Sequence, residues 1–379
     1  MWRPFWTGWF LCTFWNEKRN MNALRAPISV FLSLTYLCNL RCRHCAVYSE
    51  EATHIDLDTQ SWLSLFNELA DLKVFRLRLS GGEPFMREDI WHLLDRIDTL
   101  PMRLAINTNA SLIDRVAGER LKKLGKLDEI MVSLDGSCPE THDALRGEGS
   151  FVKVHAGIEH LTRYNLPVAF YCTVNRYNFK DLPQIAALAK AWGIASVKFN
   201  DLLPEGRGLV YYRDLALGRE EWEEALAVLK DLRRLYGTGI SGTILDQGEM
   251  YEAMRGLASQ AERPQQSNLL SGCGALNQEC AVRPDGWITP CDRLPGLKAG
   301  HIHERRFGEI WRTSEIFARF RKRREVLLSD LDECRDCTYH HTCTGGCPAT
   351  PYALYGKVIA RDPLGCYRIY SGQETFHVL

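Results

Sequence analysis

The stretch that decides the fold is Cys38-Asn39-Leu40-Arg41-Cys42-Arg43-His44-Cys45, which holds three cysteines in the spacing Cys-x3-Cys-x2-Cys. The apolar run just before it, residues 28–34, is rich in β-branched and aromatic side chains and predicts a buried strand. Three thiolates cannot complete the four-ligand shell of structural zinc. They can hold three irons of a 4Fe–4S cluster and leave the fourth open to a substrate or a cofactor. The alternative is a zinc site completed by His44 or His54.

Strands and helices are predicted to alternate after this loop. The predicted strands are 28–34, 74–79, 102–106, 129–134, 168–174 and 195–199. The predicted helices are 63–72, 90–100, 116–124, 152–164, 182–192 and a last one from Trp222 to Leu232. Repeated units of this kind indicate an α/β fold with a parallel sheet and right-handed crossovers. Six units suit a partial (β/α)6 TIM-like barrel better than a closed eight-stranded one, and place the chemistry at the C-terminal ends of the strands.

A second motif, Gly81-Gly82-Glu83-Pro84, follows the second predicted strand. Its two glycines allow backbone geometries and close approaches that a Cβ atom would block. The carboxylate of Glu83 would then stand at the barrel mouth and face a ligand. Alone the motif could be only a turn, but it becomes specific in a chain whose first strand ends in three cysteines.

Composition excludes several classes of protein. The chain has 379 residues, with 47 Lys and Arg against 47 Asp and Glu. This balance argues against nucleic acid as a partner, because such proteins carry an excess of basic residues. An apolar content of 45% excludes a mostly disordered chain. The aromatic run 5–15 is too short to span a membrane. We expect a cytoplasmic protein.

The two motifs together resemble the radical S-adenosylmethionine (radical SAM) enzymes. The resemblance covers residues 28–235 and extends through Asn107-Thr108-Asn109, Ser133-Leu134-Asp135-Gly136, His142-Asp143, Arg146-Gly147-Glu148-Gly149, Thr173-Val174-Asn175 and Pro204-Glu205-Gly206-Arg207-Gly208. It implies that the open iron binds the methionine part of SAM and that the cluster donates one electron to the sulfonium. The 5′-deoxyadenosyl radical so formed takes a hydrogen atom from the substrate.

The resemblance also implies the residues that bind SAM. Gly82 and Glu83, in the turn begun by Gly81, hold the methionine amino end. Ser133 and Arg146 contact the ribose or the carboxylate, and the backbone around His44 and Leu202 holds the adenine. Asn109 and Asp135 belong to the motifs after the third and fourth strands and are assigned to the same cofactor site.

A second group of cysteines fills the C-terminal part of the chain. Cys273 is followed by twelve residues, Gly286, four residues and Cys291, and then by Cys334-x2-Cys337-x5-Cys343-x3-Cys347 and Cys366. The pattern resembles the seven-cysteine SPASM extension of radical SAM enzymes, with Cys280 as an eighth, and it requires a hairpin turn at 283–288. By this resemblance one auxiliary 4Fe–4S cluster is held by Cys273, Cys280, Cys291 and Cys347, and the other by Cys334, Cys337, Cys343 and Cys366. The alternative is two zinc sites.

These inferences give four expected regions and three cysteines that hold no metal. The regions are an N-terminal aromatic segment (1–27), the radical SAM barrel (28–235), a linker (236–272) and the SPASM domain (273–379). Cys12, Cys138 and Cys172 are interpreted as buried or idle thiols.

The leading hypothesis for function is modification of a peptide or protein side chain by oxidation, crosslinking or maturation of a ribosomally made peptide or cofactor. SPASM-bearing relatives mostly act on peptides, and a smaller set acts on tetrapyrrole side chains. A tetrapyrrole enzyme and a non-catalytic iron–sulfur electron carrier are the alternatives. By resemblance to sulfatase maturases, Asp292 is a general base for the substrate, or else a turn residue.

The expected partners follow from the same hypothesis. They are a peptide or protein substrate and an electron donor such as flavodoxin or ferredoxin. Only 37 residues precede Cys38, too few for a leader-recognition domain, so we expect a separate recognition protein or direct recognition by the barrel. A basic run, Arg319 to Arg324, is either a solvated helix face or a docking surface for an acidic leader.

Overall fold

The computed structural model describes residues 24–46, 56–258, 268–337, 339 and 343–366. The aromatic run 5–15, Cys12 and His54 lie outside these residues. Among the residues that the structure describes, no helix is long and apolar enough to cross a membrane.

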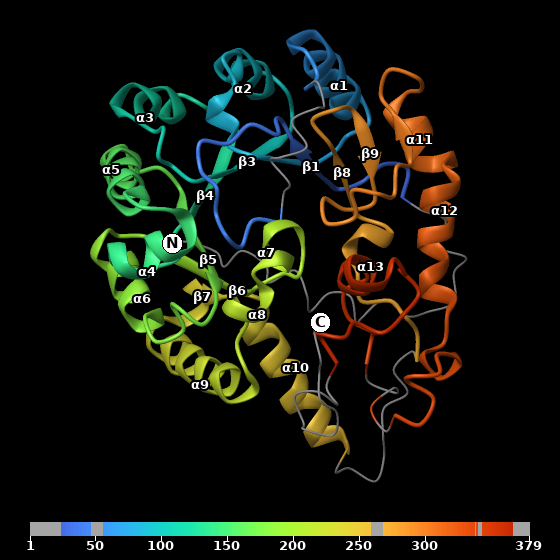
Figure 1. Cartoon of the computed structure of the whole chain (residues 1–379). Coiled ribbons are helices and arrows are strands. Elements are labelled where there is room, and N and C mark those ends of the chain that lie inside the picture. Colours follow the sequence, from blue (N-terminus) through green and yellow to red (C-terminus); the bar gives the residue numbers. More distant parts are fainter. Residues whose placement is uncertain (1–23, 47–55, 259–267, 338, 340–342, 367–379) are drawn as a thin grey trace.

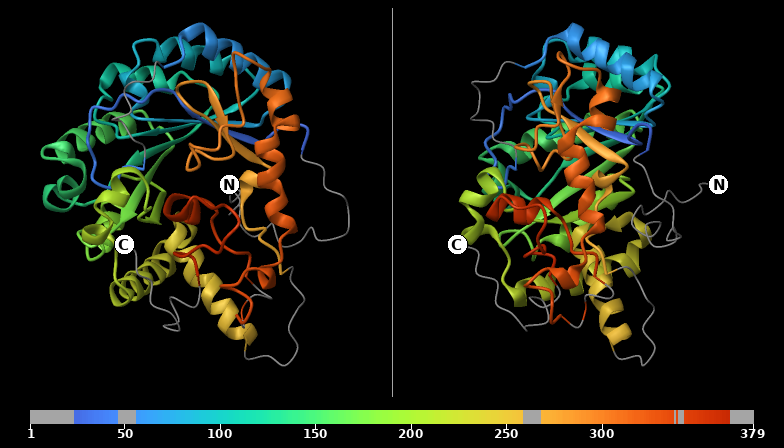
Figure 2. Two further views of the ribbon diagram at one scale, coloured as in Figure 1. Left: turned by 45° about the vertical axis from the view of Figure 1, so that its right-hand side comes forward. Right: turned by 90° about the vertical axis from the view of Figure 1, so that its right-hand side faces the viewer.

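Six parallel strands form the partial barrel that the sequence predicts (Figure 1). They are β1 (Ser29–Ser33), β2 (Arg76–Ser80), β3 (Arg103–Thr108), β4 (Leu127–Ser133), β5 (Val168–Val174) and β6 (Ser196–Asp201). Each lies beside the next one in the chain. The predicted helices are α1 (Thr59–Asp71), α2 (Ile90–Asp98), α3 (Arg115–Lys122), α5 (Ser150–Arg163), α6 (Leu182–Ala191) and α9 (Arg219–Tyr236). Figure 2 shows the sheet bent into an arc with these helices on its outer side.

The two faces of the barrel strands differ in chemistry. Every second residue, such as Val30, Leu79 and Phe170, is fully buried and packs against the helices. Each such side chain stabilises the fold by about 1.5–3 kcal/mol. The other face lines the barrel interior, which we call the lumen, and it is largely polar. The amphipathic strands therefore leave polar groups free to build a site inside the arc.

Several short elements between these units were not predicted. They are α4 (Pro139–Arg146), α7 (Gly206–Val210), α8 (Tyr212–Leu215), β7 (Ile240–Ser241), α10 (Thr243–Ala258) and the 3-10 turn η2 (Pro84–Met86). β7 adds a seventh parallel strand beside β6 but has only two residues, too few for a periodic pattern.

The C-terminal region continues the same sheet. It contains β8 (Glu279–Val282), β9 (Trp287–Thr289), β10 (Gly300–His301), α11 (Phe307–Thr313), α12 (Glu315–Arg321), α13 (Ala349–Tyr355) and the 3-10 turns η3 (Gly237–Gly239), η4 (Gly274–Leu276), η5 (Lys322–Glu325) and η6 (Leu328–Asp330). β8 pairs with β9 as the predicted hairpin and also pairs in parallel with β1. The segment around α13 lies on the open side of the arc (Figure 2). The barrel mouth therefore faces the C-terminal cysteines.

The basic run is not the solvated helix face that the sequence allowed. Arg319 is exposed, but Arg321 has only 8% of its surface exposed and Arg323 has 0%. The Arg321 guanidinium stacks over the Trp311 ring at 4.3 Å and donates to the carbonyl of Leu276 at 3.2 Å. Arg321 and Arg323 are therefore too buried to take part in a docking surface for an acidic leader.

Candidate active site

The loop that holds Cys38, Cys42 and Cys45 begins at the C-terminal end of β1, where the barrel fold predicts chemistry. It is held by the segment after β6. The Arg207 amide donates to the Cys45 carbonyl at 2.9 Å, and Arg207 Nε donates to the Cys42 carbonyl at 2.9 Å. Gly206 has a φ of +53°, and an added Cβ would lie 2.6 Å from the Cys45 carbonyl oxygen. The Gly206-Arg207 pair thus fixes the shape of the cysteine loop.

Gly81 and Gly82 lie against the chain that leads into this loop. The Gly82 amide donates to the Thr35 carbonyl at 2.7 Å, and the Glu83 amide donates to the Leu37 carbonyl at 2.8 Å. A Cβ on Gly82 would lie 2.1 Å from the Leu37 carbonyl oxygen. The glycines are therefore required for backbone packing beside the cysteine loop, which agrees with the close approach that the sequence predicted for them.

The Glu83 carboxylate is buried, with 1% of the residue exposed, rather than standing open at the barrel mouth. It accepts hydrogen bonds from the Thr108 hydroxyl at 2.8 Å, from the Asn109 amide at 2.8 Å and from the Phe85 amide at 3.3 Å. A carboxylate has about four acceptor sites, so room is left for one more donor. Burial raises the pKa of Glu83 to about 7, although the Asn109 and Thr108 hydrogen bonds lower it.

The other expected SAM contacts lie around the same strand ends. Asn109 follows β3, and its side chain joins Asn39 of the cysteine loop at 2.9 Å. Ser133 ends β4 and stands beside Tyr171 of β5. Leu202 follows β6 and is buried against Tyr212. The structure thus brings the strand-end residues to one edge of the barrel.

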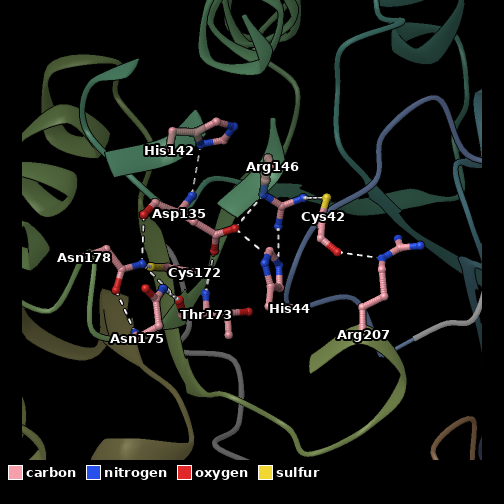
Figure 3. Close-up of polar contacts among 10 residues, drawn as sticks. All are labelled: Cys42, His44, Asp135, His142, Arg146, Cys172, Thr173, Asn175, Asn178 and Arg207. Atoms are coloured by element: carbon pink, nitrogen blue, oxygen red, sulfur yellow. Dashed lines mark hydrogen bonds and ion pairs between the residues drawn. The ribbon is translucent and has the colours of Figure 1, made fainter. Parts of the chain in front are cut away.

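Asp135 and Arg146 form a buried polar cluster with His44 of the cysteine loop (Figure 3). Arg146 Nε donates to Asp135 Oδ2 at 2.5 Å, and His44 Nε2 lies 3.4 Å from the same oxygen. Arg146 Nη1 also lies 3.8 Å from the Cys42 sulfur. Burial alone would raise the pKa of Asp135, but the positive charge of Arg146 brings it below its ordinary value, with a smaller contribution from His44 when that ring is protonated. Burial lowers the pKa of His44 to about 4, so its ring is neutral at pH 7.

Hydrogen bonds from several neighbouring residues hold Asp135 in place. Its Oδ1 accepts from the Thr173 amide at 2.7 Å, and its own amide donates to His142 Nδ1 at 3.3 Å. The Asn178 side chain closes the network by donating to the Asp135 carbonyl at 2.8 Å. Residue exposure is 0% at Asp135. This geometry suits a residue that positions Arg146. The sequence analysis singled out the His142-Asp143 motif but did not predict that His142 accepts this hydrogen bond from Asp135.

The C-terminal thiols form two groups. The first auxiliary thiol set is Cys273, Cys291 and Cys347, which pack against one small apolar core with Leu276 and Phe320. The second auxiliary thiol set is Cys334, Cys337, Cys343 and Cys366, which line one cavity. The structure thus places seven of the eight predicted ligands in two groups of thiols. Within the described residues, no three Cys, His, Asp or Glu side chains lie close enough together to hold a metal ion.

Cys280 is not brought to the first auxiliary thiol set. It lies in β8 opposite Val30 of β1 and has 0% exposure within the main apolar core. The charged groups that act on its thiol are Arg321 and Glu279, and burial is the main cause of its raised pKa. Successive side chains in a strand point to opposite faces of the sheet. The side chain of Cys280 is on the face that packs into the apolar core.

Asp292 and its neighbours connect the first auxiliary thiol set to the barrel. Asp292 is exposed and accepts from the Cys291 thiol at 3.0 Å. Arg293 links the first auxiliary thiol set to the barrel. Its Nη1 lies 3.2 Å from the Cys347 sulfur, and its Nε donates to the Glu205 carboxylate at 2.8 Å. Burial and the Asp292 charge raise the pKa of Tyr171 in the lumen to about 12. Asp292 therefore stands between the thiols and the lumen.

The lumen holds a cation that the sequence did not single out. Arg78 of β2 stacks over the Phe31 ring of β1 at 5.3 Å, and its Nε is buried. Within the described part of the chain it makes no hydrogen bond or close ion pair, although the Glu279 charge acts on it. Another cation on a barrel strand, Lys198 of β6, is paired with Glu129 at 2.8 Å. Arg78 thus remains available to an acidic ligand.

Comparison with known proteins decides the family. A family model described as the radical SAM superfamily matches residues 32–189, and a second, described as the SPASM iron-sulfur cluster-binding domain, matches 273–338. Fe-coproporphyrin III synthase of Methanosarcina barkeri is 31% identical over 363 residues, which cover 90% of this chain and 88% of the relative. The chain belongs to the radical SAM superfamily. It is also similar to mycofactocin maturase MftC of Mycolicibacterium smegmatis, at 30% identity over 347 residues that cover 90% of this chain and 83% of the relative.

A solved structure of another protein shows the same fold. SuiB of Streptococcus suis, crystallised with its precursor peptide SuiA, superposes with a TM-score of 0.71. The match has 16% sequence identity and covers 91% of this chain and 76% of SuiB. The predicted partial barrel with a SPASM extension is therefore confirmed, and the chain is a radical SAM enzyme that carries an iron–sulfur cluster-binding domain.

Proposed function

We propose that this radical SAM enzyme modifies a side chain of a peptide or protein. The observation that carries the proposal is the similarity to a maturase, MftC, over 90% of the chain. SuiB, a fold neighbour, was crystallised with its precursor peptide, which supports a peptide as occupant of this type of barrel. The proposal places the enzyme in a reducing cytoplasm, with a flavodoxin or ferredoxin as electron donor.

The donor chemistry suits iron–sulfur clusters, because cysteine thiolates are their usual ligands, and we propose three of them. Cys38, Cys42 and Cys45 hold the one that binds SAM, and the two auxiliary thiol sets hold the others. An arginine contacts a thiol of each group: Arg146 at Cys42, Arg293 at Cys347, and Arg361 at Cys366 at 3.6 Å. Such cations favour thiolates, the form that binds metal. When bound, the first cluster supplies the electron that cleaves SAM to the 5′-deoxyadenosyl radical.

The chain's own residues then hold SAM and the substrate. Glu83 accepts a hydrogen bond from the methionine ammonium, within reach of Gly81 and Gly82. Arg146, held by Asp135, faces the SAM carboxylate together with Ser133. Asp292 accepts the proton that the substrate side chain releases, because its carboxylate stands exposed between the first auxiliary thiol set and the lumen.

Replacement of Glu83 tests the SAM site through pH. With the pKa of Glu83 near 7, the carboxyl is mostly protonated at acidic pH and ionised at alkaline pH. Because the ammonium group favours the ionised form, the affinity of the wild-type enzyme for SAM should rise as the pH rises through 7. Glu83→Gln should bind SAM about 10- to 100-fold more weakly, since a charge-assisted hydrogen bond contributes about 1.5–3 kcal/mol.

The measurement is equilibrium binding of SAM to the reconstituted enzyme at several pH values, without reductant. Asp95→Asn, a change of an exposed helix carboxylate, is the matched control and should bind as the wild type does. A Glu83→Gln curve that keeps the wild-type pH dependence would contradict the proposed role of Glu83.

Replacement of Cys280 tests the ligand set of the first auxiliary cluster. We expect Cys280→Ala to keep the iron content of the wild type, about twelve atoms for three 4Fe–4S clusters, because Cys280 lies in the apolar core. Cys291→Ala, in contrast, should lose about four irons. Iron is counted on the anaerobically reconstituted variants. Equal loss in both would show that Cys280 is a ligand after all, as the spacing suggested.

A tetrapyrrole is the second candidate substrate. Its support is the 31% identity to Fe-coproporphyrin III synthase and the unpaired Arg78 in the lumen, whose guanidinium could hold a propionate carboxylate.

One experiment separates the two candidates. The reduced enzyme is incubated with SAM and either the product of a short peptide gene beside its own or Fe-coproporphyrin III. Chromatography then follows 5′-deoxyadenosine, and mass spectrometry follows each candidate substrate. We expect the peptide to gain a mass change in step with 5′-deoxyadenosine. A mass change confined to the porphyrin would favour the second candidate.

A further inference from the structure

Arg323 is a buried cation without a close anionic partner. It lies in η5 with 0% exposure. Its guanidinium donates only to backbone carbonyls: Nη1 to Val358 and, at 3.3 Å, to Ala360, and Nη2 to Gly345 at 3.4 Å and Gly346 at 3.3 Å. Within the described residues no carboxylate forms an ion pair with it. A buried charge is costly unless an opposite charge compensates it.

The carbonyls that bind Arg323 belong to the segments that carry the thiols. Gly345 and Gly346 lie between Cys343 of the second auxiliary thiol set and Cys347 of the first. As thiolates, Cys273, Cys347 and Cys343 would each act electrostatically on the Arg323 guanidinium. Arg323 is therefore positioned between the two sets. The arginines that contact single thiols, Arg293 and Arg361, have no such shared position.

Two further observations show that the protein itself does not satisfy this cation. Arg323 Nε is buried and has no acceptor among the described residues. Asp362 is the carboxylate whose charge acts on Arg323, but its oxygens already accept from the amides of Cys347 at 2.9 Å and Leu364 at 2.9 Å. Unsatisfied buried donors are rare in folded proteins, so each one needs a structural or functional reason.

We propose that Arg323 is the shared counter-charge of the two auxiliary clusters and raises the reduction potential of both. Thiolate-ligated clusters carry net negative charge, and reduction adds one more negative charge to them. A fixed cation in a low-dielectric interior therefore favours the reduced state. The inference rests on the proposed auxiliary clusters and goes beyond them, because it assigns the residue that sets their potentials.

The test compares two variants of Arg323 in the full-length, reconstituted protein. Arg323→Gln keeps N–H donors for the carbonyls and removes the charge, and Arg323→Lys keeps the charge. Arg319→Gln is the matched control, because this arginine lies in α12 one turn away with 77% of its side chain exposed. Iron is counted on every sample, and the clusters are titrated with reductant and followed by electron paramagnetic resonance. Added SAM marks the signal of the first cluster, which serves as an internal reference.

We expect the ratio of reduced to oxidised auxiliary cluster at a fixed potential to fall about tenfold in Arg323→Gln, equal to about 59 mV for one electron. The potential of the first cluster should not change, and Arg323→Lys and Arg319→Gln should match the wild type. If Arg323→Gln alone loses auxiliary iron while Arg323→Lys keeps it, the need for charge is equally supported.

Three results would overturn the proposal. They are unchanged auxiliary potentials in an Arg323→Gln protein with full iron, an equal shift of all three clusters, and loss of iron in both variants, which would show that guanidinium geometry rather than charge is needed. A wild-type protein with only one cluster would instead contradict the proposed auxiliary clusters, so the two failures can be told apart.

Discussion

Asp135→Asn should destabilise the protein by about 3–5 kcal/mol and reduce SAM cleavage at least about 100-fold. The wild-type carboxylate is buried and compensates the charge of Arg146 at 2.5 Å. An asparagine of the same size leaves Arg146 as an unpaired buried cation, and its NH2 group must oppose either Arg146 or the Thr173 amide. Arg146 would then lose the geometry that places it beside Cys42 and the proposed SAM carboxylate.

The measurements are denaturant unfolding and the rate of 5′-deoxyadenosine formation. Asp128→Asn is the matched control, because Asp128 pairs with Arg76 at 2.5 Å and Arg103 at 3.2 Å at the other end of the strands. This control should lose stability and keep SAM cleavage. An Asp135→Asn protein that cleaves SAM at the wild-type rate would contradict the positioning role of Asp135.

Acidification should weaken the ion pair between Asp135 and Arg146. The pKa of Asp135 is lowered in the folded state, so its ion pair contributes stability at pH values above the ordinary aspartate range. This contribution is lost only as the pH falls through the lowered folded-state pKa. Asp135→Asn removes it at every pH, so the difference in stability between wild type and variant should shrink in strong acid.

Gly82→Ala should remove the cluster that binds SAM and abolish SAM cleavage. The added Cβ would lie 2.1 Å from the Leu37 carbonyl oxygen and 2.9 Å from that of Tyr36, and both contacts are with backbone that cannot rotate away. Relief of the clash breaks the hydrogen bond from the Gly82 amide to Thr35 and displaces the chain that enters the cysteine loop. We expect a loss of about four irons of about twelve.

Iron analysis and chromatography for 5′-deoxyadenosine measure this effect. Gly125→Ala is the control, because its Cβ would meet nothing nearer than the Asp98 carboxylate at 3.9 Å. That variant should keep full iron and full activity. If Gly82→Ala kept both as well, the close packing of this turn against the cysteine loop would be refuted.

The sequence predicted the barrel well because strand and helix patterns alternate along the chain. In β2, Leu77 and Leu79 are buried in the main core while Arg76 and Arg78 alternate with them, and this period of two is readable without a structure. The cysteine spacings identified Cys38, Cys42 and Cys45 as one group directly after β1, and the second auxiliary thiol set lines one cavity. That these groups bind iron–sulfur clusters stays a prediction. These features depend on local spacing.

Features that depend on long-range packing were not predictable. The resemblance assigned Cys280 to the same cluster as Cys273 and Cys291, but the parallel pairing of β8 with β1 places it in the apolar core. The basic run was expected to be solvated because charged residues usually are, and only the packing of η5 buries Arg323. Glu83 was expected at the barrel mouth, facing a ligand, and the structure encloses its carboxylate with hydrogen bonds from Thr108 and Asn109.

We propose that this radical SAM enzyme holds three iron–sulfur clusters and acts on a peptide. The most direct measurement is anaerobic reconstitution, followed by metal analysis and by chromatography for 5′-deoxyadenosine after incubation with SAM and a strong reductant. We predict about twelve irons per chain, no zinc, and 5′-deoxyadenosine even without substrate. Zinc in place of iron, or full iron without any 5′-deoxyadenosine in the presence of candidate peptides, would contradict this account.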